Sequence, residues 1–315
     1  MSSQHKAILL YGPTAAGKTG ASLHLAKEFS GEIINADSRQ IYQGMPIITA
    51  MPSADEQAQA PHHLFDFLPP TESFSVGRWL TLAKEKAEEI WARGGVPIFV
   101  GGTGFYLRVL REGISPMPET DTDILNSYQS RLEREGNEKL YEELKKIDPT
   151  WAAKTSPEDS HRLLRGLSIY KQTGKTLSQW QEEPLAGALQ ADFLALAISP
   201  ERDVLNERIH LRYQIMVEEG VLDEARNLYD KYLKDLNPEN VPPPALKSIG
   251  LFDYADYFSG KITEQEAHDR VAQQMRKYAK RQRTWLRNSY GPDEVFENGA
   301  EVGKILSRGG EFLLS

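Results

Sequence analysis

Residues 6–19 read KAILLYGPTAAGKT, and this stretch decides the fold. Residues 6–11 are a short apolar run that predicts a buried strand, which Gly12-Pro13 end. The residues after it, GPTAAGKT, match the pattern G-x-x-x-x-G-K-[ST] of a loop whose backbone N–H groups surround phosphates. Residues 17–29 predict a helix. A strand, a glycine loop and a helix therefore follow one another in the order that phosphate binding requires.

Outward from this loop, short apolar strands alternate with helices. Residues 32–36 (EIINA), 96–100 (VPIFV) and 192–199 (DFLALAIS) predict further strands, and residues 77–93 predict an amphipathic helix. Another helix is expected from about Thr103. This alternation predicts an α/β fold, a P-loop NTPase-like core with a parallel sheet flanked by helices.

The stretch 116–190 has a different character, because it contains charged helical segments and no convincing strand. We interpret it as a helical insertion domain. The core then consists of residues 1–115 and 191–315 and ends in basic helices.

The composition excludes several classes of protein. The chain of 315 residues has no cysteine, which rules out disulfides and thiolate zinc sites, and it has no apolar run of the ~18 residues that a transmembrane helix needs. The polar start leads directly into the first strand, so we expect no cleaved leader, no membrane association and a cytoplasmic location. The net charge of −8 argues against a protein coated in nucleic acid, but it leaves a local basic groove open.

The glycine loop supplies the first candidate site. Lys18 is expected to reach phosphate oxygens, and the Thr19 hydroxyl is expected to bind Mg²⁺. The pattern identifies the ligand group and not the reaction, since kinases, NTPases and transferases all use it. The predicted diphosphate-binding residues are Gly12, Pro13, Thr14, Ala15, Ala16, Gly17, Lys18 and Thr19.

Asp37 follows the second predicted strand, at the edge of a parallel sheet where ligands bind. A carboxylate there can take a proton from a nucleophile or touch a metal. An Asp that caps the next helix explains the same position equally well. Ser38, Arg39 and Gln40 add donors and acceptors suited to a base or a phosphate. The GGTG turn at 101–104 follows the third strand. Thr103 could line the same crevice, although a plain strand-to-helix turn is the simpler interpretation.

Basic residues cluster in three further places. Residues 276–287 (RKYAKRQRTWLR) contain six basic side chains and no acid, which favours contact with a polyanion. Arg162 and Arg165 lie three apart on a predicted helix, and Arg208 and Arg212 lie four apart on another. For these two pairs, ordinary surface arginines or structural ion pairs remain open.

Taken together, these segments resemble the tRNA dimethylallyltransferases, also called isopentenyltransferases. The P-loop alone is unspecific, whereas DSRQIY followed by GGTG and later by AKRQRTW is highly specific. The matching segments span nearly the whole chain in the family's order: GPTAAGKT at 12–19, NADSRQIY at 35–42, GGTGFYLR at 101–108, HRLLRGLSIY at 161–170, RYQIMVEEG at 212–220 and YAKRQRTWLRN at 278–288.

The resemblance implies two substrates, dimethylallyl diphosphate and the adenosine 3′ of the anticodon in a tRNA stem-loop. It implies that the P-loop holds the diphosphate of the donor and not ATP, with Mg²⁺ at Thr19, and that Asp37, Thr103 and Arg212 are catalytic. We expect a monomer of the bacterial type. The residues that the resemblance and the basic run assign to tRNA are Asp37, Ser38, Arg39, Gln40, Thr103, His161, Arg162, Leu163, Leu164, Arg165, Lys280, Arg281 and Arg283.

The chain departs from the family pattern at three places. Leu125 and Lys247 stand where many members have arginine, and Leu251-Phe252-Asp253 replaces Tyr-Arg-Gln. The contacts of those family residues are therefore not carried over to this chain.

Two other functions fit part of the sequence. A P-loop kinase for a nucleoside or another small metabolite explains residues 12–19 and Asp37, but it leaves the basic segment 276–287 without a role. A nucleotide-gated RNA-binding protein explains the basic segment, but it leaves the acid in the crevice without a task.

Overall fold

The computed structural model describes residues 5–236 and 242–315. They form two compact units. The first comprises the chain up to Arg111 together with Leu189–Ser315, and the second is Glu112–Ala188, where the sequence suggested an insertion at 116–190. None of the helices in the described ranges is long and apolar enough to cross a membrane.

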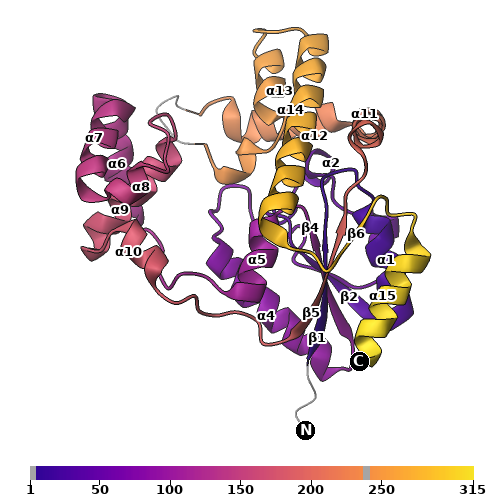
Figure 1. The fold of residues 1–315 in the computed structure, drawn as a ribbon. Helices are drawn as coiled ribbons and strands as arrows, with labels where there is room; N and C mark the ends of the chain where they lie inside the picture. Colours follow the sequence, from indigo (N-terminus) through magenta and orange to yellow (C-terminus); the bar gives the residue numbers. More distant parts are fainter. Residues whose placement is uncertain (1–4, 237–241) are drawn as a thin grey trace. The chain divides into compact units, whose positions relative to one another are not determined.

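The first unit is built on a parallel sheet (Figure 1). Its strand order is β3-β2-β4-β1-β5-β6, and every neighbouring pair runs parallel. The central position of β1 explains why its residues are almost purely apolar, since both faces of the strand are covered. The strands are β1 Lys6–Tyr11, β2 Gly31–Asn35, β3 His62–His63, β4 Val96–Gly101, β5 Asp192–Ile198 and β6 Glu294–Phe296.

Helices cover both faces of this sheet (Figure 1). On one face, Ile8 and Leu10 pack against Leu25 of α1 (Lys18–Phe29) and Ile305 of α15 (Val302–Leu314). On the other face, Phe99 meets Trp79 of α4 (Val76–Ala92), which stacks on Tyr106 of α5 (Gly104–Glu112) with ring centroids 4.5 Å apart.

A second group of helices lies at the carboxyl ends of the strands and encloses its own apolar core, which includes Ile209, Leu251, Tyr254 and Val271. Its longest member, α14, extends upward from the sheet in Figure 1. The elements of this group are α2 Pro46–Thr49, α11 Arg202–Glu218, α12 Val221–Leu228, η1 Tyr229–Leu233, η2 Pro244–Lys247, α13 Leu251–Phe258 and α14 Glu264–Trp285. The short helix α3 (Ala54–Gln57) and the turn η3 (Leu286–Tyr290) complete the first unit.

The second unit is helical in all its described elements and packs around Leu140, Leu144, Leu163 and Leu167, with Trp151 at the edge of this core. Its helices are α6 Thr122–Glu135, α7 Asn137–Ile147, α8 Pro149–Ala152, α9 Ser160–Thr173 and α10 Leu177–Glu182.

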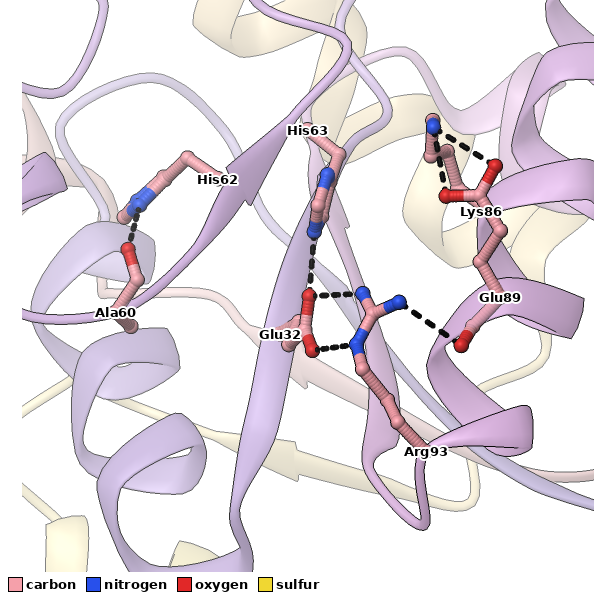
Figure 2. Close-up of polar contacts among 7 residues, drawn as sticks. All are labelled: Glu32, Ala60, His62, His63, Lys86, Glu89 and Arg93. Carbon is pink, nitrogen blue, oxygen red and sulfur yellow. Dashed lines mark hydrogen bonds and ion pairs between the residues drawn. The ribbon is translucent and has the colours of Figure 1, made fainter.

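An ion cluster ties down the β3 edge of the sheet (Figure 2). Glu32 of β2 accepts two hydrogen bonds of 2.6 Å from the Arg93 guanidinium and one of 2.6 Å from Nε2 of His63 in β3. Hydrogen bonding to Arg93 lowers the pKa of Glu32, and the contact with His63 adds to this. The cluster holds the two-residue strand β3 and the turn before β4 against β2.

The predicted fold class is confirmed, and the strands expected at 6–11, 32–36, 96–100 and 192–199 are present within one or two residues. The two outer strands β3 and β6 escaped sequence analysis. With two and three residues, they are too short to show any alternation of apolar and polar side chains.

Candidate active site

The phosphate loop, residues 12–19, connects β1 to α1 at the carboxyl edge of the sheet. Ala15 and Gly17 have φ values of 61° and 97°, so the chain turns twice through the left-handed region before the helix begins. At Gly12, a Cβ would lie 2.6 Å from the Ile198 carbonyl oxygen of β5, which explains the glycine there. The loop therefore has the open backbone that an anion needs at a helix N-terminus.

Lys18 lies inside this loop, and its ammonium donates to the Pro13 carbonyl at 2.9 Å. The pKa of Lys18 is lowered to about 8, mainly by burial; the charge of Asp37 opposes this shift, and nearby Arg212 adds to it. An anion placed in the loop would stabilise the charged form of Lys18, because a nearby negative charge offsets the water that burial removes from around the ammonium.

Asp37 is held in a turn and caps no helix. Its Oδ1 accepts from the Arg39 backbone N–H at 2.9 Å, and its own N–H donates to Asn35 Oδ1 at 2.8 Å. Residues 37–41 form bends and turns and no helix. The interpretation of Asp37 as an N-cap is therefore wrong, since the carboxylate serves a local Asx turn that aims it into the crevice.

Thr103 is tied to the same turn. Its hydroxyl oxygen accepts from the Ser38 N–H at 3.0 Å and donates to the Ser38 hydroxyl at 3.3 Å. The glycines before it are required by close packing: a Cβ on Gly101 would lie 2.0 Å from the Ala36 carbonyl oxygen. The GGTG segment is thus more than a plain turn, because it packs the end of β4 directly against the Asp37 loop.

These loops surround one cavity of about 410 Å³, entirely within the first unit. Lys18, Thr19, Asp37, Arg212 and Tyr278 all line it. Residues distant in the sequence meet here because the carboxyl ends of parallel strands share one edge.

Arg212 enters the cavity from α11. Its Nη2 donates to the Ala50 carbonyl at 3.1 Å, and its buried Nε has no hydrogen-bond partner within the described part of the chain. Burial lowers the pKa of Arg212, while Glu56 and Glu219 oppose the shift. A buried guanidinium with an unsatisfied donor suits an anionic ligand.

Arg39 and Gln40 line the cavity, but their polar groups also hold neighbouring loops. Arg39 donates to the Pro244 carbonyl at 2.6 Å, and Gln40 donates to the Ala50 carbonyl at 2.8 Å. Their first role in this structure is to shape the wall of the cavity.

Comparison with known proteins now decides the family. The family model "IPP transferase" matches residues 40–289, and the model "Isopentenyl transferase" matches residues 5–61. The chain belongs to the IPP transferase family. Among its relatives, the tRNA dimethylallyltransferase of Parvibaculum lavamentivorans is 40% identical over 90% of this chain and 88% of its own. That of Anoxybacillus flavithermus is 40% identical over 96% of this chain and 95% of its own.

Solved structures agree with this assignment. The tRNA isopentenylpyrophosphate transferase of Bacillus halodurans is 34% identical, has a TM-score of 0.66, and the match covers 99% of this chain and 100% of the other. A eukaryotic dimethylallyltransferase acting on tRNA is 33% identical with a TM-score of 0.75, over 90% of this chain and 70% of the other.

In this family member, the basic run falls on α14 and the turn after it. Arg276, Lys277, Lys280 and Arg281 are exposed and Arg283 is half-buried, whereas Ala279 and Gln282 face the interior. Lys280, Arg281 and Arg283 are absent from the ion pairs found among the described residues. An open groove of about 560 Å³ runs along Lys280, Arg281 and Trp285. We call this surface the basic face of α14.

Two aromatic residues of α14 take different roles. Trp285 packs between Tyr11 and Tyr290, with ring centroids 5.2 and 5.7 Å away, so it anchors the helix to the sheet. Tyr278 lines the cavity, and burial together with the charge of Asp37 raises its pKa. Of the two, Tyr278 is the one placed to meet a base in the cavity.

The residues predicted in the second unit divide into two groups. Leu163 and Leu164 are buried in the core of that unit, so the geometry does not support the prediction that their side chains contact tRNA. His161 is exposed. Arg162 lies over the Trp151 ring at 4.3 Å, and Arg165 donates to the Pro118 carbonyl at 3.2 Å. The two leucines fasten this part of α9 to the core of the second unit. Only the polar residues of the segment therefore remain candidates for tRNA contact.

The described residues contain no group of three or more His, Cys, Asp or Glu side chains arranged to hold a metal ion. Mg²⁺ nonetheless fits the cavity, because this ion is usually bound by one or two protein oxygens together with substrate phosphates and water. The Thr19 hydroxyl lines the cavity beside Lys18 and is one oxygen suited to such an arrangement; the Asp37 carboxylate lines the same cavity.

Sequence analysis missed Gln282, which is buried and contacts both the phosphate loop and the GGTG turn. It lies inside the run KRQRTW, where the surrounding charges dominate the pattern. Only its position three residues after the buried Ala279 and four before the buried Leu286 could have suggested an inward side chain.

Proposed function

We propose that this chain transfers a dimethylallyl group from dimethylallyl diphosphate to the exocyclic N6 amine of the adenosine 3′-adjacent to the anticodon of tRNA, releasing diphosphate. The observation that carries the proposal is the single cavity that joins the phosphate loop to Asp37 and Arg212 and lies next to the basic face of α14. Membership of the IPP transferase family supports prenyl transfer to tRNA as the reaction class.

The donor half of the cavity stabilises a leaving group. The bond between the allylic carbon and oxygen breaks, and its electron pair leaves on the diphosphate. Loop N–H groups, the Lys18 ammonium and the Arg212 guanidinium would face the charge that develops there, and a water-poor site strengthens such contacts. Mg²⁺ at the Thr19 hydroxyl and the diphosphate oxygens would supply further neutralisation of this charge.

The acceptor half must activate a weak nucleophile. The N6 lone pair forms the new bond to the allylic carbon, and one N6 proton passes to the Asp37 carboxylate. The Asx turn and the contacts of Thr103 with Ser38 hold this carboxylate at the cavity wall. The adenine must leave its stack to reach the cavity, as base-modifying enzymes generally require.

Binding of the tRNA itself is assigned to basic side chains that are exposed or half-buried. The basic face of α14 offers Lys280, Arg281 and Arg283, and the second unit offers His161, Arg162 and Arg165. Phosphate contacts of this kind position a nucleic acid without reading its sequence. We propose that the protein acts as a monomer, because one chain supplies the phosphate loop, Asp37 and Arg212 to the same cavity.

Stoichiometry tests the choice of donor. The protein is incubated with tRNA, Mg²⁺ and either dimethylallyl diphosphate or ATP, and released diphosphate is counted against modified tRNA. We expect one diphosphate for each modified tRNA and no modification with ATP alone. ATP hydrolysis that is required for, and proportional to, tRNA modification would favour the kinase-like alternative.

A further inference from the structure

Gln282 makes three contacts that join separate parts of the site. Its Oε1 accepts from the Thr14 N–H of the phosphate loop at 3.0 Å. Its Nε2 donates to the Gly102 carbonyl at 3.0 Å, and its backbone carbonyl accepts from the Tyr11 hydroxyl at 2.9 Å. One residue of α14 thus binds the end of β1, the loop after it and the turn after β4.

The surroundings leave this carboxamide little freedom. Gln282 is only 5% exposed, and a Cβ on Gly102 would lie 2.2 Å from its Nε2. The same virtual Cβ would lie 3.3 Å from Oδ2 of Asp37, so the carboxamide and the carboxylate meet at Gly102. Nearby, a Cβ on Gly104 would lie 2.0 Å from the Trp285 ring. Gly102 and Gly104 therefore leave the space in which the side chains of α14 pack.

This arrangement determines which amides of the phosphate loop face a ligand. The Thr14 N–H donates to Gln282 Oε1, so it points toward α14 and is not available to an anion in the loop. Two residues of this short loop, Ala15 and Gly17, lie in the left-handed region, and the hydrogen bond from outside the loop to the Thr14 N–H helps to preorganise this conformation.

We propose that Gln282 is a positioning residue that holds the phosphate loop and the Asp37 side of the cavity in the geometry needed for diphosphate binding. The inference rests on the proposed function, because it takes a diphosphate as the ligand of the loop. Gln282 belongs to α14, the helix whose basic face is assigned to tRNA, but it would act on the phosphate loop that holds the donor.

Gln282→Met tests the two side-chain hydrogen bonds, since methionine has a similar length and cannot make either. We expect it to weaken binding of inorganic diphosphate with Mg²⁺ by about tenfold or more, because a buried N–H and a buried carbonyl lose their partners. The transfer reaction should show this loss in KM for the donor, with a smaller change in KM for tRNA. Gln273→Met, an exposed position of the same helix, is the matched control and should behave as wild type.

Gln282→Glu supplies a second readout that a merely structural role would not give. A protonated carboxyl group offers one acceptor and one donor, as the carboxamide does, whereas a carboxylate repels the Gly102 carbonyl. Asp37, Tyr11, Tyr278 and Lys18 are the titratable groups around this position. Burial and the Asp37 charge should raise the pKa of the new carboxyl group. Diphosphate affinity relative to wild type should therefore recover as the pH falls from about 8 to about 6.

The outcomes separate the two proposals. If the wild-type protein binds no diphosphate and transfers no prenyl group, the proposed function fails. If wild type does both, the positioning inference is overturned by a Gln282→Met protein that binds diphosphate as wild type does, or by a folded Gln282→Glu protein with a pH-independent deficit. Circular dichroism and melting curves of each variant establish that it is folded.

Discussion

Asp37 lies in an Asx turn that asparagine can also form, so its replacement by asparagine tests the carboxylate without removing the turn. Asparagine keeps the Oδ1 acceptor for the Arg39 N–H but cannot take a proton from an amine. We predict that Asp37→Asn lowers the single-turnover transfer rate by about 10²- to 10⁴-fold, the usual contribution of a general base. The affinity for tRNA, measured by filter binding, should change little, since phosphate contacts elsewhere supply most of it. A folded variant that transfers within about threefold of the wild-type rate would remove Asp37 from the chemistry.

Lys18 allows a prediction about pH. Because burial lowers its pKa to about 8, the free protein loses this charge as the pH rises through that value. A bound diphosphate favours the charged form, so affinity for the donor should fall as the pH rises above about 8, and binding there should take up a proton. Lys18→Arg stays charged throughout and should flatten the pH dependence between about pH 7 and 9.5.

Lys18→Ala should lower turnover by about 10²-fold or more at about pH 7, where Lys18 is charged, because a charge-assisted contact in a dry site is lost. Calorimetry and single-turnover rates provide the two measurements. A pH profile of donor affinity that is identical in the wild type and the arginine variant would show that Lys18 does not titrate in this range.

At the scale of elements, the two sides of α14 differ: its exposed basic side chains are assigned to tRNA, whereas its buried Gln282 contacts the phosphate loop. Replacing Lys280 and Arg283 with alanine, while keeping Arg281 because it also lines the cavity, should weaken tRNA binding and reduce the slope of log affinity against log salt by about one to two units, since each lost phosphate contact contributes somewhat less than one. Binding of dimethylallyl diphosphate without tRNA should stay close to wild type. An unchanged salt slope would assign these side chains a structural role only.

The helix α9 of the second unit carries a similar prediction. Arg162→Gln with Arg165→Gln should weaken tRNA binding, while Arg134→Gln, whose side chain is exposed and pairs with Glu135, serves as the control on α6. Melting curves are needed beside the binding curves, because Arg162 lies over Trp151 and its loss affects packing. Equal tRNA affinity for the double variant and the control would exclude this helix from the interface.

The elements also show how far sequence reasoning extends. The central strands were predictable because both their faces are buried, which leaves an unbroken apolar run such as AILLY. The phosphate loop was predictable because its chemistry needs glycine, lysine and threonine at fixed spacing. By contrast, the helical layer of α11 to α14 is positioned by long-range packing of Ile209, Tyr254 and Val271, which no local pattern encodes.

The site was predictable to a smaller degree. The position of Asp37 followed from the end of β2, but its Asx turn depends on the buried Asn35, and helix capping had explained the same residues equally well. Thr103 and Arg212 stood out from their positions in the sequence, but their catalytic roles came from family resemblance and remain predictions. Gln282 was invisible because its partners, Thr14 and Gly102, are brought to it only by the assembled sheet.

For the whole molecule, the decisive question is which bond the assembled cavity makes. In the proposed function, the phosphate loop holds a diphosphate donor, Asp37 faces a flipped adenine and basic surfaces bind tRNA, so that a prenyl group is joined to one adenosine. A kinase built on the same loop would instead move the terminal phosphoryl group of ATP.

The most direct measurement is the mass of the tRNA nucleosides after reaction. Unmodified tRNA and a variant with guanosine in place of the adenosine 3′ of the anticodon are each incubated with the protein, Mg²⁺ and dimethylallyl diphosphate, then digested and weighed. The account predicts that one adenosine gains the mass of a C5H8 unit in the first tRNA and that none does in the second. Nucleosides of unchanged mass in both, from a folded protein that binds tRNA and diphosphate, would contradict it.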